Sequence, residues 1–143
     1  MTYIVAYLIL PVEYKGVPSI PKTYLARRCC MQNTMTVSGC PGTTVRELPP
    51  AHGLQFLEVN IERGGEVPLH THECAATMIV TRGSARKLTG NGKSELVKPG
   101  DVIAKAAKEL HGFTEVGEEG FQFISLSDDG GIVRHGNLDM AFA

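Results

Sequence analysis

The stretch GEVPLHTHECAATMIVTRG, residues 65–83, decides how the rest of the chain is interpreted. It places His70 and His72 one residue apart in a run whose flanks are rich in strand-forming residues. Side chains alternate between the two faces of a strand, so an uninterrupted strand directs every second residue from His70 to Ala76 to one face. Two imidazoles on one face can both reach one ion at about 2.0 to 2.1 Å. The pattern therefore predicts a metal site that needs a further ligand from elsewhere in the chain.

A second informative stretch is Pro99-Gly100-Asp101. Proline sets the φ angle of the first central residue of a tight turn, and glycine accepts the positive φ of the next. The chain is therefore expected to reverse here, and a strand is expected to leave from Asp101. His111 follows ten residues after Asp101.

The chain from Thr34 onward has the pattern of an all-β protein. Turn residues separate short strand-like runs, and no stretch keeps a helical period for three turns. This spacing predicts a single-domain antiparallel β-barrel or jelly roll over residues 34–143, preceded by an extended N-terminal arm over residues 1–33. The expected strands are residues 34–38, 43–49, 54–62, 66–72, 76–82, 84–90, 94–98, 101–106, 111–116, 121–127 and 131–136.

The arm carries no chemistry that its sequence identifies. Its apolar start, TYIVAYLIL, is too short to span a bilayer and lacks the basic leader of a signal peptide. We expect it to cover a sheet face or add a strand to a second copy, which predicts a homodimer. Whether Met31 is an alternative start is left open by the sequence. Four cysteines, including the vicinal Cys29 and Cys30, are too few for a disulfide scaffold, so reduced thiols and a cytoplasmic location are expected.

Charge and length narrow the classes of partner. The chain has 143 residues, enough to bury a core without disulfides, and a formal net charge of -1. With a pI near 6.5 it has no basic field for nucleic acid and no polybasic patch for anionic lipid. We therefore expect a small-molecule ligand or substrate, with no nucleic acid and no membrane as partner.

The two histidine-bearing motifs together resemble those of the cupin superfamily of small antiparallel β-barrels. The matching residues are Gly65, His70, His72 and Gly83 in its first motif and Pro99, Gly100, Asp101 and His111 in its second. The gap between the first glycine and the first histidine is one residue shorter than usual. The resemblance covers roughly residues 54–126, and two motifs in the right order are a much stronger signal than either alone.

The resemblance implies that His70, His72 and His111 hold one divalent metal ion inside the barrel. The sequence departs from the family at Ala76, which stands at the place of a metal-binding glutamate and has no donor atom. Cys74 remains open as a fourth ligand or as part of the pocket, because a thiolate is a good ligand for zinc or iron.

Other polar residues have plainer interpretations. Glu73 should face away from the metal, and His52 and His135 are expected to be solvated. Glu115 stands where the family often has asparagine and is a weak candidate for an acid or base. Strand histidines are in general ordinary polar residues, and some family members have lost the metal, so a metal-free pocket is the alternative. No catalytic residue is identified.

Several metals and functions remain open at this point. Neutral imidazoles suit iron, zinc, manganese, nickel and copper, with iron or zinc favoured. A three-histidine face resembles that of thiol and diketone dioxygenases in the superfamily, which use Fe(II), and of zinc members such as small polyketide cyclases. The resemblance therefore implies a metal-dependent oxygenase acting on a small organic molecule. The alternatives are a non-catalytic ligand-binding or sensing cupin and a zinc-type cyclase or isomerase.

Overall fold

A computed structural model of the chain describes residues 34–128 and 130–143, which form strands and turns without a helix. No segment of this part is a helix with the length and apolar character needed to cross a bilayer. The arm predicted over residues 1–33 lies outside the described residues. The strands are β1 Thr34–Thr36, β2 Thr43–Ala51, β3 Leu54–Ile61, β4 Val67–Thr71, β5 Ala76–Gly83, β6 Ala85–Thr89, β7 Ser94–Val97, β8 Val102–Lys105, β9 His111–Thr114, β10 Phe121–Ser127, β11 Val133–Arg134, β12 Asn137–Leu138 and β13 Ala141–Phe142.

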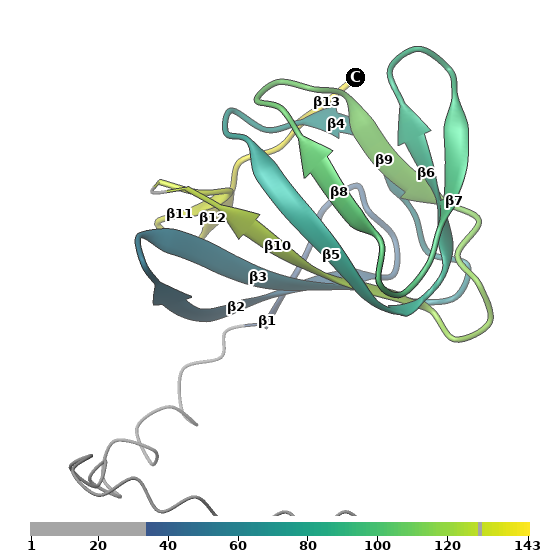
Figure 1. The fold of residues 1–143 in the computed structure, drawn as a ribbon, viewed down its shortest axis with the longest axis horizontal. Helices are drawn as coiled ribbons and strands as arrows, with labels where there is room; N and C mark the ends of the chain where they lie inside the picture. Colours follow the sequence, from purple (N-terminus) through teal and green to yellow (C-terminus); the bar gives the residue numbers. More distant parts are fainter. Residues whose placement is uncertain (1–33, 129) are drawn as a thin grey trace, which may run out of the picture. The chain divides into compact units, whose positions relative to one another are not determined.

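The strands form two larger antiparallel sheets and one short ribbon (Figure 1). One sheet has the order β1-β2-β3-β10-β5-β8, and the other has the order β13-β4-β9-β6-β7. β11 and β12 form the ribbon. Strands far apart in the sequence are neighbours, because β10 lies between β3 and β5. The predicted all-β, antiparallel barrel or jelly roll is thus confirmed for the described residues.

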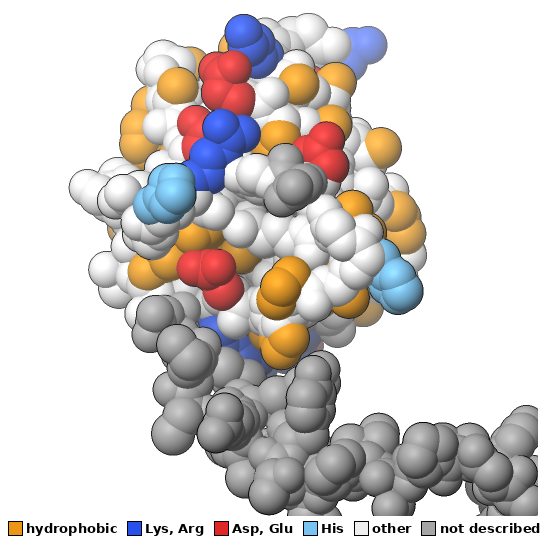
Figure 2. Space-filling view, turned by 90° about the vertical axis from the view of Figure 1, so that its left-hand side faces the viewer, with side chains coloured by type: hydrophobic (Ala, Val, Ile, Leu, Met, Phe, Trp, Pro, Cys, Tyr) orange, Lys and Arg blue, Asp and Glu red, His pale blue; other side chains and the backbone are white. Residues whose placement is uncertain are grey.

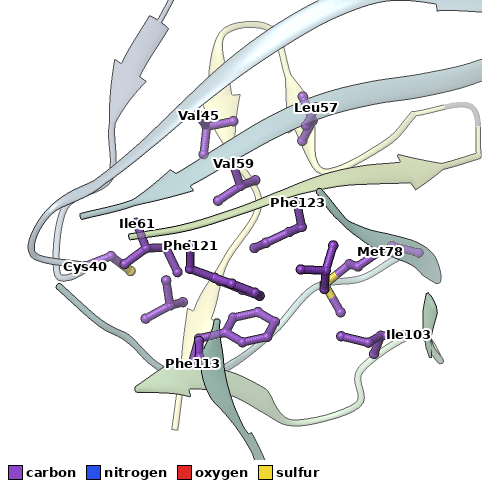
Figure 3. Packing of buried hydrophobic residues seen from close by; sticks show 14 of the residues in the cluster. Cys40, Val45, Leu57, Val59, Ile61, Met78, Ile103, Phe113, Phe121 and Phe123 are labelled. Atoms are coloured by element: carbon purple, nitrogen blue, oxygen red, sulfur yellow. The ribbon is translucent and has the colours of Figure 1, made fainter. Parts of the chain in front are cut away.

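The core fills the space between the two sheets. Phe113 from β9 contacts Phe121 and Phe123 from β10, with ring centroids 5.1 and 5.2 Å apart (Figure 3). These tilted ring pairs bring the two sheets together, and aromatic pairs of this kind contribute about 0.5 to 1.5 kcal/mol beyond the area that they bury. Leu57 and Met78 extend the same core. These five residues belong to the buried apolar core.

The reversal predicted at residues 99–101 is present and has the expected chemistry. Gly100 has a φ of 93°, and the amide of Asp101 donates to the carbonyl of Lys98 at 3.0 Å. The carboxylate of Asp101 accepts a hydrogen bond from the amide of Lys98 at 2.9 Å, which fixes the turn from its other side. β8 leaves from this turn and pairs with β5.

The common strand face expected for every second residue from His70 to Ala76 is wrong, because a bend separates the two strands predicted over residues 66–72 and 76–82. β4 ends at Thr71, the chain bends over residues 72–75, and Ala76 begins β5 in the other sheet. The bend is stabilised by side chains that take the place of strand partners. The Asp139 carboxylate accepts from the amide of Glu73 at 3.0 Å, and the Lys105 ammonium donates to the carbonyl of Cys74 at 2.9 Å. The corner between the sheets therefore begins at His72.

Candidate metal centre

The fold brings together the three histidines that the sequence singled out. His70 lies on β4 and is the cross-strand partner of His111, the first residue of β9. His72 follows one residue after the end of β4. All three are buried, and one ring nitrogen of each lies within 4.8 Å of those of the other two. The cluster is therefore built by one strand pair and the corner next to it.

Backbone hydrogen bonds determine which nitrogen of each ring faces the cluster. Every Nδ1 lies against a carbonyl oxygen, which only accepts, so the proton belongs on Nδ1 and the lone pair on Nε2. The acceptors are the carbonyls of Pro68 for His70 (2.8 Å), Glu109 for His111 (3.0 Å) and Asp139 for His72. This is the outer-shell arrangement that orients metal-binding histidines in proteins.

The spacing of the free nitrogens suits a metal ion. The Nε2 atoms of His70 and His72 are 3.0 Å apart. Two lone pairs directed at each other over this distance repel unless a cation lies beside both. Two nitrogens that each lie 2.0 to 2.1 Å from one ion are roughly 2.9 to 3.4 Å apart at angles between 90° and tetrahedral. The His70–His72 spacing therefore fits one divalent ion, and a ring nitrogen of His111 lies within 4.8 Å of both.

Burial keeps these imidazoles neutral. It lowers the pKa of His70 to about 4 and that of His111 to about 3, and it lowers the pKa of His72 as well. The neighbouring rings and Lys105 add a smaller effect in the same direction. At neutral pH no proton has to leave Nε2 before a metal binds, and proton competition begins only in acid.

A cavity of about 50 Å³ adjoins the histidines. Its walls are mainly apolar, and no acidic side chain of the described residues lines it. Leu57, Met78, Phe113 and Phe123 belong to the wall. The volume holds a few water molecules or a ligand group of similar size.

Sequence reasoning missed Lys105, which lines this cavity at the end of β8. The side chain is buried, and burial lowers its pKa. Lys105 has the same strand parity as Ile103, which is buried, whereas Val102 is 65% exposed. Since both residues at the start of this strand are apolar, their alternation could not show which face is inward.

The C-terminal segment was also missed. β13 pairs with β4, with Phe142 opposite His70, and the carbonyl of Asp139 accepts from the ring of His72. A signal was present in the sequence, since Leu138, Met140 and Phe142 recur at every second residue as in a strand. The segment completes the surroundings of a histidine 67 residues earlier in the chain.

Cys74 and Ala76 lie beside the cluster and are not part of it. The sulfur of Cys74 is not among the clustered donor atoms, and burial raises its thiol pKa. Its role as a fourth ligand stays a prediction. Ala76 is buried and has the parity of Met78, which lines the cavity. Its cross-strand partner on β8 is Lys105, so a methyl group beside an ammonium replaces the family's carboxylate.

The remaining polar candidates are at the surface. Glu73 pairs with Lys108 at 3.5 Å, and Glu115 with Arg86 at 2.9 Å. Both carboxylates are exposed, and so are the side chains at positions 52 and 135. Figure 2 shows basic and acidic side chains interspersed on one face. The outward orientation predicted for Glu73 is confirmed, and Glu115 has no access to the histidines.

Comparisons with known proteins agree with this fold. A family model described as a cupin domain matches residues 57–127. The polyketide cyclase RemF from Streptomyces resistomycificus is 22% identical over 81% of this chain and 82% of its own, with a TM-score of 0.65. KdgF from a Halomonas species is 22% identical over 67% of this chain and 86% of its own, with a TM-score of 0.58.

An RmlC-like cupin from Shewanella frigidimarina is 20% identical over 68% of this chain and 83% of its own, with a TM-score of 0.56. At these identities the likeness concerns the fold alone. None of the curated proteins compared with the sequence matches it. The family match, the two motifs and the shared fold together establish that the chain belongs to the cupin superfamily.

Proposed function

We propose that this cupin holds one divalent metal ion through His70, His72 and His111 and uses it to transform a small organic molecule. The observation that supports the proposal best is the cluster of three buried imidazoles, whose donor atoms lie within 4.8 Å of one another and whose Nδ1 atoms each lie against a backbone carbonyl. A purely structural role for three buried histidines does not require all three to keep the same nitrogen unpaired.

The residues of the site each have a definite task in this proposal. The three histidines hold the ion without neutralising it, because all are uncharged at neutral pH. The apolar wall excludes bulk water and accepts the hydrocarbon part of a substrate. A divalent ion in such a shell supplies Lewis acidity and, as Fe(II), reactivity toward O₂. We therefore propose a non-haem oxygenase as the first candidate activity, in the cytoplasm, where thiols such as Cys40 and Cys74 stay reduced.

A second candidate is a Lewis-acid reaction such as cyclisation or isomerisation with zinc. Lys105 favours it, because a second cation in the cavity stabilises an enolate without any change of oxidation state. The likeness to a polyketide cyclase has the fold as its basis and is compatible with both candidates.

The two candidates differ in their need for O₂. The full chain is loaded with Fe(II) without air, or with Zn(II), and given a panel of β-diketones, small thiols and catechols. O₂ uptake that needs Fe(II), a panel compound and His111 supports the oxygenase, and anaerobic turnover with Zn(II) supports the Lewis-acid candidate. His111→Gln is the test variant, and His52→Gln, at an exposed position, is the matched control. Saturable binding without product under either metal would replace both candidates by a binding or sensing cupin.

A further inference from the structure

Lys105 is a buried cation without an ion-pair partner among residues 34–128 and 130–143. Its side chain lies in the cavity wall, the residue is 4% exposed, and its ammonium donates one hydrogen bond, to the carbonyl of Cys74 at 2.9 Å. None of the ion pairs in the part of the chain that the structure describes includes Lys105. An ammonium carries three donors and is costly to bury unpaired, so one carbonyl leaves it incompletely satisfied.

The two carboxylates that raise the pKa of Lys105 through their charge, Glu109 and Asp139, have other partners. The carboxylate of Glu109 accepts from the amide of Ala106 at 2.7 Å, and that of Asp139 accepts from the amide of Glu73 at 3.0 Å. Neither side chain lines the cavity. The anion that Lys105 lacks is therefore not supplied by these neighbours.

All the charges of the proposed site are positive. Three neutral histidines leave a divalent ion with its full charge, and the ammonium of Lys105 adds one more positive charge in the same cavity. Ala76 stands at the place where the family has a carboxylate, and it lies directly opposite Lys105 across the β5–β8 pair. The lining thus lacks the negative charge that would balance the site, while its walls are apolar.

We propose that Lys105 is a substrate-binding residue and that the substrate of this centre is a small organic anion. Its carboxylate or enolate group lies between Lys105 and the three histidines, and its hydrocarbon part contacts the apolar wall. This inference rests on the proposed function. Burial lowers the pKa of Lys105, and a bound anion would raise it again, so ligand and lysine charge stabilise each other.

Two probes of nearly equal size separate charge from shape. Pyruvate carries a carboxylate where butane-2,3-dione carries a methyl ketone. Both are titrated by calorimetry and by visible absorption into the Co(II)-loaded full chain, as wild type, Lys105→Met and Lys105→Arg. Lys87→Met is the matched control, since Lys87 is a mostly buried lysine that pairs with Glu95 and does not line the cavity.

We expect Lys105→Met to weaken pyruvate binding at least tenfold while butane-2,3-dione binding and Co(II) content stay unchanged. Lys105→Arg should recover part of the pyruvate affinity, and Lys87→Met should behave as wild type. The melting temperature of ligand-free Lys105→Met should change little, because the loss of the bond to the Cys74 carbonyl opposes the removal of a buried charge. A lysine with a merely structural role would instead lower the melting temperature and leave the ratio of the two affinities unchanged.

Equal pyruvate affinity in wild type and Lys105→Met, or no pyruvate binding to the wild type, would overturn the inference. A chain that binds no Co(II) would count against the proposed function instead. The titration of pyruvate into the metal-free chain then decides the role of Lys105, with a tenfold difference supporting it and equal affinity opposing it. If Lys105→Met does not fold by circular dichroism, Lys105→Gln replaces it in the same comparison.

Discussion

Single residues decide which nitrogen of each imidazole is available to a metal. His70 and His111 donate to carbonyls two residues before them in the chain, so both orient their rings by local backbone geometry. His72 instead donates to Asp139, far away in the sequence. The orientation of His70 and His111 should therefore persist in most side-chain variants, whereas that of His72 depends on a tertiary contact.

Position 76, where the family has a metal-binding glutamate, gives a prediction for a single residue. Ala76→Glu should return an anionic ligand to the cavity side of β5, but the new carboxylate will also pair with Lys105 across the strands. We expect slower metal loss to a chelator in Ala76→Glu, and a larger gain in Ala76→Glu combined with Lys105→Met. Thr77→Glu, one residue on and of opposite parity, is the control. Loss at the wild-type rate in the folded double variant would show that position 76 does not face the metal.

The residues of the site differed in how far they could be predicted. The three histidines carry a spacing that the sequence displays directly, and the structure brings them together as expected. Lys105 could not be assigned, because the strand that carries it begins with two apolar residues of opposite parity. Asp139 acts through its backbone carbonyl, which no side-chain pattern reveals.

At the scale of elements, short strands with clear turn residues were predictable and their partners were not. Alternation indicates that residues 66–72 and 76–82 form strands, but it does not indicate to which sheet each belongs. The corner at residues 72–75 is stabilised by Lys105 and Asp139, both distant in sequence. The sequence pattern does not show which distant segments contact each other, so it could not predict this corner.

Strand β13 is expected to contribute to metal affinity through its pairing with β4. Deleting residues 141–143 removes its pairing with β4 and the bond from the amide of Ala143 to the carbonyl of Leu69 at 3.0 Å. Asp139 is then held less firmly against His72, and loss of an outer-shell partner typically lowers metal affinity about 10- to 100-fold. Zinc affinity measured against a competing chelator should fall in this range. Phe142→Ala, which keeps the backbone pairing, should lose much less, and equal affinity in deletion and wild type would refute a role for β13.

For the whole molecule, the buried histidines make stability depend on pH. In the metal-free chain, His70 and His111 have a pKa of about 4 and about 3, against 6.5 when unfolded. Well above pH 6.5 both histidines are unprotonated in the folded and in the unfolded chain, so the free energy of unfolding has its full value there. As pH falls toward 4, the unfolded state gains protons that the folded state does not.

The expected loss at pH 5 is on the order of 2 kcal/mol for each of these two histidines. Urea unfolding of the metal-free chain at pH 7 and pH 5 measures it. His111→Gln, which cannot take up this proton, should lose less stability over the same interval by about the contribution of one histidine. The same loss in wild type and variant would show that His111 is not kept neutral by burial.

The homodimer remains a prediction at the same scale. Ile79 and Val102 are cross-strand partners with exposed apolar side chains on the six-stranded sheet. We expect a dimer for the full chain by light scattering at micromolar concentration, and a weaker dimer with unchanged metal content after removal of the residues before Met31. A monomeric full chain would contradict it.

The most direct test of the metal centre is the metal content of protein purified without added metal. The wild type should carry about one divalent ion per chain. His72→Ala should fold and carry little, because packing between the sheets holds the fold and the loss of a ligand is local. The exposed-site variant His52→Ala should match the wild type. Equal metal in wild type and His72→Ala, or none in the wild type even after incubation with Fe(II) or Zn(II), would contradict the three-histidine centre.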